Sequence, residues 1–445
     1  MTTSASAASF PADPWPAPTP SAPLDATVVV PGSKSQMNRA LPLAALASEP
    51  TTITGALDSR DSDLMIAALR ALGTSVSVSD DRRTVHVEPR PLRGPAAIDC
   101  GLAGTVMRFL PPIAALADGP ITLDGDPAAR VRPMGPVLQA LADLGVEVTG
   151  TGASTAGGNG PGYLPCVVRG RGGVDGGDVA VDASGSSQFV SSLLLAAPRF
   201  GRGITVTHVG DRLPSVPHIT MTVEAMRARG VRIDDSRSGR WRVEPGPIAG
   251  GEVAIEPDLS NAGPFLAAAL AAGGTVRVPG WPSATAQPGD LLRDLLTRMG
   301  AEVELAGGTL TVRGTGEPAP LVADLSLAGE LTPTLAALCT LAEGTSRLTG
   351  VAHLRGHETD RLAALVTEIT RLGAEAEELP DGLVIHGGRS RLRGAVMETY
   401  ADHRMATFAA IIGLAVPDVR IRDVATTRKT IADFPALWTG MLRGA

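Results

Sequence analysis

The sequence predicts a mixed α/β protein of the α+β kind, made of two similar globes that each contain three βαβαββ units. Two repeating patterns and the composition support this fold. The patterns recur along most of the chain, and 44% of the 445 residues are hydrophobic, which is enough for two packed cores. Aromatic residues make up only 3%, so these cores must consist mainly of Ala, Leu, Val and Ile.

The first pattern is an Ala/Leu-rich helix that ends near Gly or Pro and is followed by a short strand of Thr and branched residues. Its six copies are spaced by about 70 residues, as expected for a repeated fold unit. The central strand residues of the copies are Ile53, Ile121, Ile204, Val276, Leu348 and Ile421.

The second pattern lies between copies of the first and is a helix that ends in Gly and leads into an alternating strand. Its glycines are Gly73, Gly145, Gly230, Gly300 and Gly373. Glycine suits a helix C-cap because the cap needs a left-handed backbone. General α/β alternation in an alanine-rich chain is the alternative, but two interleaved markers at matched spacing favour one unit used six times.

Six units divide most simply into three and three, with a break near residues 256–258. We expect a flexible tail over residues 1–24, which are rich in Ala, Ser, Thr and Pro. One globe would then contain residues 25–36 and 258–445, and the other residues 37–257. With helices inward and sheets toward solvent, the globes would be joined by a hinge and separated by a cleft, a favoured place for ligands.

Composition excludes several classes of function. A net charge of −7 and few aromatic residues disfavour binding to nucleic acid. Cys100, Cys166 and Cys339 lie far apart, which fits neither a disulfide framework nor a zinc site and indicates a reducing cytoplasm. The apolar runs are too short for a membrane span, and the start lacks the basic residues of a secretory signal. We expect a cytoplasmic monomer that binds no membrane.

The segment from Pro31 to Ala40, PGSKSQMNRA, is the most informative motif. It follows a β-type run and precedes an Ala/Leu-rich helix, and it carries Lys34, Ser35 and Arg39. Free N–H groups at a helix start, together with cations and hydroxyls, make a site for a small anion. A nucleotide P-loop is excluded because its glycine spacing is absent. An ordinary turn with surface charges is the alternative.

Other unit boundaries carry comparable groups, among them Gly104, Ser186, Ser187 and Gln188. The two serines could simply cap a helix. Cations recur at similar places in different units and would meet in one cleft, where they could hold two multiply charged anions. They are Lys34, Arg39, Arg132, Arg361, Arg404 and Lys429.

Two carboxylates close to these cations are candidates for proton transfer, Glu330 and Glu358. Burial in a closed cleft raises a carboxyl pKa, whereas adjacent cations lower it. A simple ion pair with Arg361 at helical spacing is the alternative for Glu358. His353 and His357 have the spacing of helical metal ligands, but no third ligand accompanies them, so we expect no metal.

Together the ordered motifs resemble the EPSP synthases (3-phosphoshikimate 1-carboxyvinyltransferases) of the enolpyruvyl transferase family. The resemblance runs from Val28 to Lys429. Its motifs are PGSKSxxNRA from Pro31, AGTxMR from Ala103, RxRPMG from Arg130, SSQF from Ser186, HETDR from His357, DHRM from Asp402 and RKT from Arg428. The family fold, two globes of three βαβαββ units each, agrees with the repeats.

The resemblance implies transfer of the enolpyruvyl group of phosphoenolpyruvate to the 5-hydroxyl of 3-phosphoshikimate, without metal, cofactor or covalent enzyme intermediate. Glu330 would be the base and Glu358 the acid, and Lys34 would be a third catalytic residue. Glu330 and His357 would also contact substrate. The residues implied for 3-phosphoshikimate are Lys34, Ser35, Arg39, Ser186, Ser187, Gln188 and Ser215. Those implied for phosphoenolpyruvate are Lys34, Gly104, Arg132, Gln188, Arg361, Arg404 and Lys429.

The sequence departs from the family pattern near this site. Glu330 replaces the usual aspartate, and His357 replaces a lysine, so a fixed charge becomes titratable. Leu102 and Phe109 replace an asparagine and a proline next to the phosphoenolpyruvate site, where the inhibitor glyphosate acts in this family. Two alternatives remain: an enolpyruvyl transferase acting on UDP-N-acetylglucosamine, whose loop cysteine is absent after Leu123, and a non-catalytic phosphometabolite sensor.

Overall fold

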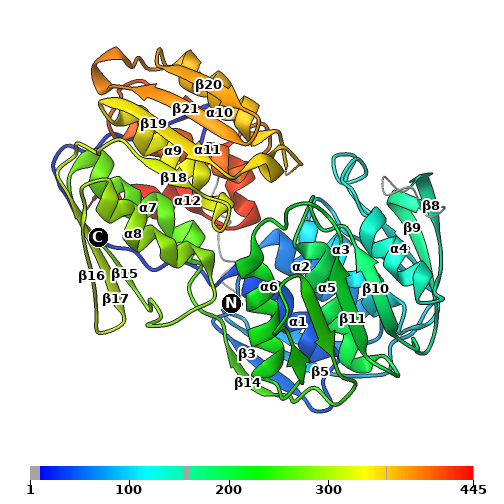
Figure 1. The fold of residues 1–445 in the computed structure, drawn as a ribbon. Helices are drawn as coiled ribbons and strands as arrows, with labels where there is room; N and C mark the ends of the chain where they lie inside the picture. The colour runs from blue at the N-terminus through cyan, green and yellow to red at the C-terminus, as the bar shows by residue number, and fades with distance from the viewer. Residues whose placement is uncertain (1–10, 154–160, 357, 444–445) are drawn as a thin grey trace.

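The computed structural model describes residues 11–153, 161–356 and 358–443, which form two globes side by side (Figure 1). Two separate hydrophobic cores define them. One core contains buried residues from Met37 to Ile255, and we call this body the central globe. The other combines Trp15–Val30 with Leu259–Met441, and we call it the terminal globe. The mixed α/β fold class predicted from the sequence is confirmed.

In the part that the structure describes, the central globe contains three four-stranded sheets and six α-helices. Its helices are α1 (Lys34–Ala45), α2 (Arg60–Ala71), α3 (Gly104–Ala114), α4 (Gly135–Asp143), α5 (Gln188–Ala196) and α6 (Val216–Arg227). Its strands are β3 (Thr51–Thr54), β4 (Ser75–Val78), β5 (Thr84–Glu88), β6 (Ala96–Asp99), β7 (Asp118–Asp124), β8 (Glu147–Ala153), β9 (Pro161–Arg171), β10 (Gly177–Val181), β11 (Ile204–His208), β12 (Ile233–Asp234), β13 (Arg240–Val243) and β14 (Gly251–Ala254).

The terminal globe repeats this arrangement with two four-stranded sheets and one three-stranded sheet. Its helices are α7 (Leu259–Ala272), α8 (Leu292–Arg298), α9 (Thr332–Leu341), α10 (Arg361–Arg371), α11 (His403–Gly413) and α12 (Phe434–Leu442). Its strands are β1 (Trp15–Pro16), β2 (Leu24–Thr27), β15 (Gly274–Pro279), β16 (Glu302–Ala306), β17 (Thr309–Gly314), β18 (Val322–Asp324), β19 (Gly344–Thr349), β20 (Glu375–Leu379), β21 (Gly382–Gly387), β22 (Val396–Met397) and β23 (Arg420–Ile421).

Each sheet has one topology: a parallel pair followed by antiparallel strands, as in the order β6-β7-β9-β8. The six strand residues predicted from the first pattern all lie in the second strand of their sheet and are buried. The five glycines of the second pattern all have positive φ after a helix, between 79° and 99°. These repeats therefore identify the unit correctly, because burial and cap geometry recur with it.

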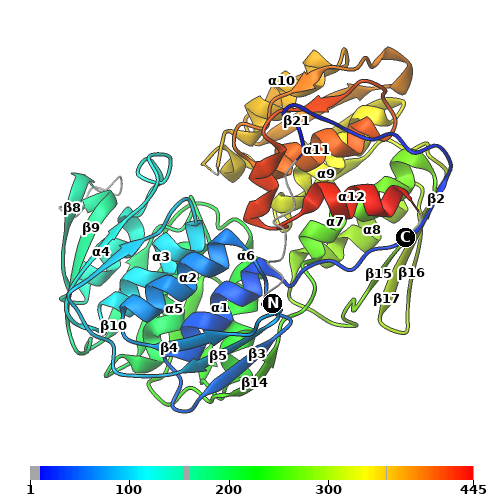
Figure 2. The ribbon, with the colours of Figure 1, turned by 180° about the vertical axis from the view of Figure 1, so that it is seen from behind.

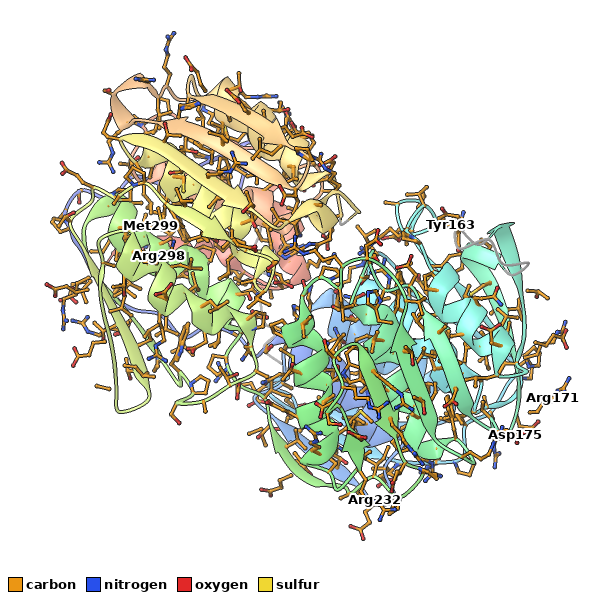
Figure 3. The ribbon with its side chains drawn as sticks, in the orientation of Figure 1. Tyr163, Arg171, Asp175, Arg232, Arg298 and Met299 are labelled. Carbon is orange, nitrogen blue, oxygen red and sulfur yellow. The ribbon has the colours of Figure 1, made fainter. Side chains whose placement is uncertain are left out.

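Helices occupy the inside of each globe. In the central globe α1, α3 and α5 contact one another, and in the terminal globe α7, α9 and α11 do so. Helix α3 is buried along its whole length, which explains why its sequence is mostly apolar, with Arg108 as its one charged residue. The sheets lie outside these helices (Figure 2). Charged side chains such as Arg171, Arg232 and Arg298 project from the outer surfaces (Figure 3).

The chain crosses between the globes twice. In each globe, the strand that precedes one crossing pairs with a strand that follows the other crossing. β14 pairs in parallel with β3, and β2 pairs in parallel with β15. The crossing segments themselves run together, since the Ser33 N–H donates to the Glu256 carbonyl at 2.7 Å and the Asp258 N–H to the Pro31 carbonyl at 2.9 Å. A Cβ on Gly32 would lie 2.2 Å from the Gly55 carbonyl oxygen, so only glycine fits there.

The predicted flexible tail is wrong for residues 15–24. β1 pairs antiparallel with β23 and completes the sheet of the sixth unit. Trp15 is buried and packs edge-on against Phe434, with ring centroids 6.2 Å apart. The N-terminal segment follows the terminal globe before it reaches α1 (Figure 2). A Pro-rich composition concealed a strand that finds its partner about 400 residues away, which local signals do not reveal.

Candidate active site

The cleft between the globes brings together every predicted site residue that the structure describes. Its lining includes Lys34, Ser35, Arg39, Gly104, Arg132, Ser186, Ser187, Gln188, Ser215, Glu330, Glu358, Arg361, Arg404 and Lys429. His357, the remaining predicted residue, lies outside the described residues. The predicted convergence of distant cations therefore holds for all the others.

Helices of both globes begin at this cleft, so that their N-termini line it. First-turn residues of α1, α3, α5, α7 and α11 all contribute to its lining. Such ends carry partial positive charge and unpaired N–H groups, which favour anions. At α1, Ser33 caps the helix by accepting a hydrogen bond from the Gln36 N–H. The next residue, Lys34, places its Nζ 3.7 Å from Asp61 Oδ2.

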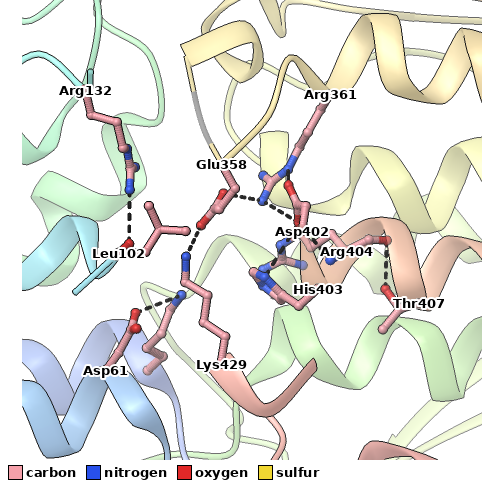
Figure 4. Close-up of polar contacts among 11 residues, drawn as sticks. Asp61, Leu102, Arg132, Glu358, Arg361, Asp402, His403, Arg404, Thr407 and Lys429 are labelled. Carbon is pink, nitrogen blue, oxygen red and sulfur yellow. Dashed lines mark hydrogen bonds and ion pairs between the residues drawn. The ribbon is translucent and has the colours of Figure 1, made fainter. Parts of the chain in front are cut away.

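The arginines that the central globe contributes to the cleft are held by neutral partners. Arg39 donates to Thr222 Oγ1 at 2.7 Å, the Ser35 carbonyl at 2.7 Å and the His218 carbonyl at 2.8 Å. Burial lowers the pKa of Arg39 to about 10, and Glu330 opposes this effect. Arg132 donates to the Leu102 carbonyl at 3.2 Å (Figure 4). A Cβ on Gly104 would lie 3.0 Å from the Arg132 guanidinium, so this glycine makes room for the arginine.

Two cations of the terminal globe, Arg361 and Lys429, are instead paired with carboxylates (Figure 4). Arg361 Nε donates to Asp402 Oδ2 at 2.6 Å, and its NH2 group donates to Glu358 Oε2 at 2.8 Å. Lys429 Nζ donates to Glu358 Oε1. Arg404 lies next to this network, since its backbone N–H donates to Asp402 Oδ1 at 2.9 Å. Glu358 thus bridges two cations, and its predicted ion pair with Arg361 exists inside the cleft.

Cations decide the ionisation of both candidate catalytic carboxyls. Burial alone would raise the pKa of Glu358, but Lys429, Arg361 and Arg132 override it and hold that pKa well below its usual range. Glu330 behaves in the same way, with His218 and Arg404 opposing burial. Both groups are therefore carboxylates at neutral pH without substrate.

Contacts across the cleft involve two histidines. His218 Nε2 of α6 lies 2.5 Å from Glu330 Oε1, and His353 Nε2 lies 3.4 Å from Ser215 Oγ. Burial lowers the pKa of His353 and favours its neutral form. Glu330 Oε2 is buried without a hydrogen-bond partner among the described residues, which leaves one carboxylate oxygen for a ligand.

Several lining residues were not selected from the sequence. Arg108 donates to Gln188 Oε1 at 3.0 Å, and its place in the AGTVMR motif was a usable signal. His403 is buried beside Arg404, and burial holds its pKa well below the usual value. His218 and Asp61 carry no local signal, because only the packing of α6 and α2 around α1 brings them here.

The fold and cleft define a protein of six repeated units whose two globes bring cations and two carboxylates together in one cleft. The family model described as EPSP synthase (3-phosphoshikimate 1-carboxyvinyltransferase) matches residues 18–438. A curated 3-phosphoshikimate 1-carboxyvinyltransferase from Kocuria rhizophila is 53% identical over 442 residues, 97% of each chain. The chain therefore belongs to the EPSP synthase family and is an enolpyruvyl-transferring enzyme of the shikimate pathway.

Solved structures agree with this fold. Two EPSP synthase structures from Acinetobacter baumannii match with TM-scores of 0.77 and 0.76. Each is 23% identical in sequence, and each match covers 97% of both chains. In the part of the chain that the structure describes, no helix combines the length and apolarity needed to cross a membrane.

Proposed function

We propose that this enzyme transfers the enolpyruvyl group of phosphoenolpyruvate to the 5-hydroxyl of 3-phosphoshikimate and releases phosphate. The observation that supports this most strongly is the meeting of cations from both globes with Glu330 and Glu358 in one cleft. The two substrates are anions that repel each other in water. Charge-assisted contacts contribute about 1.5–3 kcal/mol each, so such a cleft offsets the repulsion.

3-Phosphoshikimate would bind on the central-globe side. The N-terminus of α5 offers backbone N–H groups and the hydroxyls of Ser186 and Ser187 to the phosphate. Gln188, Ser35, Arg39, Lys34 and Ser215 would complete this site. The free Oε2 of Glu330 would accept the proton of the 5-hydroxyl, since an ionised carboxylate is competent as a base.

Phosphoenolpyruvate would bind between Arg132 and Gly104 on one side and Arg361, Arg404 and Lys429 on the other, with Lys34 and Gln188 close to it. Its phosphate would compete with Glu358 for Lys429 and Arg361. Losing those partners raises the pKa of Glu358, so substrate binding itself would prepare this carboxyl to act as an acid.

The reaction would proceed by addition and elimination. The 5-hydroxyl oxygen forms a bond to C2 of phosphoenolpyruvate while Glu358 gives a proton to the methylene carbon. The resulting tetrahedral intermediate then returns a proton from its methyl group to the Glu358 carboxylate, and its C–O bond to phosphate breaks, which forms the enolpyruvyl double bond and releases phosphate. We propose that the globes close on the two crossing segments at Gly32 and Pro257 to exclude water.

Phosphate release with both substrates tests this function. We expect release only when 3-phosphoshikimate and phosphoenolpyruvate are both present, and none when UDP-N-acetylglucosamine replaces the former. Titration calorimetry that records binding of both compounds without any phosphate release would instead support a sensor and overturn the proposal.

Four expectations from the sequence stay predictions. We propose that the domain boundaries fall at residues 36/37 and 257/258, between the two cores. We further predict a monomer in the cytoplasm. The predicted role of His357 in substrate binding awaits mutation to lysine, the residue usual in the family.

A further inference from the structure

The turn that leads into α11 has an unfavourable backbone. Tyr400 and Ala401 have φ values of 54° and 56°, so two successive residues with a Cβ occupy the left-handed region. L-residues rarely adopt this conformation, and it persists only where surrounding contacts enforce it. Both side chains are exposed, so burial in the core does not hold the turn.

The Asp402 N–H closes the turn on the Thr399 carbonyl at 2.8 Å, and a buried carboxylate supplies further contacts. Glu368 of α10 is fully buried, and its Oε1 accepts a hydrogen bond from the Tyr400 hydroxyl at 2.7 Å. Its Oε2 accepts from the Glu398 N–H at 3.1 Å, and Arg371 lies 3.3 Å from Oε1. The Glu368 carboxylate thus accepts two hydrogen bonds from the segment that forms the turn. Burial together with Glu368 raises the pKa of Tyr400 to about 12, which keeps the donating hydroxyl protonated.

A second contact between α10 and the turn segment lies at the cleft, where Arg361 donates to Asp402. Glu368 and Arg361 lie two turns apart on one face of α10. Arg361 pairs with Asp402, the residue that directly follows the strained pair, and Asp402 in turn accepts from the Arg404 N–H. The Glu368–Tyr400 contact therefore fixes, from outside the cleft, the register in which Arg361, Asp402 and Arg404 come together.

We propose that Glu368 and Tyr400 are positioning residues for the phosphoenolpyruvate side of the cleft. The inference rests on the proposed binding of phosphoenolpyruvate by Arg361 and Arg404. The hydrogen bond from Tyr400 to Glu368 holds the Tyr400–Ala401 backbone in its unfavourable conformation, and that conformation sets where the two arginines present their guanidinium groups.

Tyr400→Phe tests this role because it removes one hydroxyl and keeps the ring. We expect KM for phosphoenolpyruvate to rise about 3- to 10-fold, with KM for 3-phosphoshikimate unchanged, since one charge-assisted hydrogen bond is lost on one side of the cleft only. Tyr163→Phe is the matched control, because Tyr163 is half-buried and lies on the central globe, away from this turn (Figure 3). It should leave both constants unchanged.

Adding Ala401→Gly to Tyr400→Phe tests the role of the backbone. Glycine takes a positive φ without the Cβ penalty, so the turn needs less support. We expect the double variant to recover part of the lost phosphoenolpyruvate KM. A structural weakness without a positioning role would show as a lower Tm with both KM values unchanged or raised equally, and either result would overturn the proposal.

Arg404→Ala separates failure of this inference from failure of the proposed function. If Arg404→Ala raises KM for phosphoenolpyruvate and Tyr400→Phe does not, only the positioning role is wrong. If Arg404→Ala leaves that KM unchanged, the assignment of the site itself is wrong, and the positioning proposal falls with it.

Discussion

Apart from Lys34, which lies 3.7 Å from Asp61, the two sides of the cleft hold their cations in different ways. In the central globe, Arg39 and Arg132 donate to carbonyl and hydroxyl oxygens. In the terminal globe, Arg361 and Lys429 are paired with Asp402 and Glu358. Neutral partners orient a guanidinium without cancelling its charge. Carboxylate partners neutralise the cation, and a buried carboxylate is stable in its ionised form only while the cation is present. The cleft arginines of the central globe therefore keep their charge available for an anion. On the terminal globe, an anionic substrate would have to replace Glu358 as the partner of Arg361 and Lys429.

The largest effect is expected from Glu358→Gln, which keeps the size of the side chain but cannot transfer a proton. Turnover should fall at least about 1000-fold, in the upper range for general acid catalysis, while both substrates still bind. Steady-state kinetics and calorimetry measure the two effects. Glu244→Gln, at an exposed pair with Arg232, is the control and should keep wild-type turnover. Near-normal turnover of Glu358→Gln would remove this residue as the acid.

Arg361→Ala should lower both the stability of the fold and the affinity for substrate. The arginine is 2% exposed, and its removal leaves the buried carboxylate of Asp402 without its cation. Breaking a buried pair from one side costs about 3–5 kcal/mol. Urea unfolding of the substrate-free enzyme measures this loss. Arg313→Ala, which removes an exposed partner of Glu304 in the same globe, should cost less than about 1 kcal/mol. Equal stability of the two variants would contradict the contrast between the sides.

Arg132→Ala should lower the use of phosphoenolpyruvate by about 10- to 100-fold and leave stability near that of the wild type, since its partner is only a carbonyl oxygen. The matched control is Arg130→Ala, two residues away, where the arginine is exposed and paired with Asp124. An unchanged KM for phosphoenolpyruvate in Arg132→Ala would argue against its contact with this substrate.

The smallest effect concerns acid stability. The folded enzyme holds the pKa of Glu358 below the ordinary 4.5, so the unfolded chain binds a proton first as pH falls. Stability from this group is therefore present above about pH 4.5 and is lost below it. Wild-type unfolding free energy should drop between about pH 6 and pH 3, and Glu358→Gln should drop less over that window. An equal slope for both proteins would show that the cations do not favour the carboxylate form.

Much of the fold was accessible from the sequence because its signals are local and repeated. A C-cap glycine such as Gly145, or a buried strand centre such as Ile121, has the same physical cause in every unit. The cations of the cleft were accessible for a related reason, since several of them, such as Lys34, Arg361 and Arg404, stand in the first turn of a helix. The strand at Trp15 was missed because its only partner lies at the other end of the chain.

By itself, the sequence determined the repeating unit, the presence of two cores and most of the cations that line the cleft. Only the tertiary structure decided how these residues are paired: that Glu358 bridges Lys429 and Arg361, that His218 reaches Glu330 from the opposite globe, and that Glu368 grips the turn before Asp402. The physical reason is the sequence separation over which each kind of interaction acts. Caps and periodic burial act within a few residues, whereas charge pairing and desolvation depend on which distant groups share one buried volume.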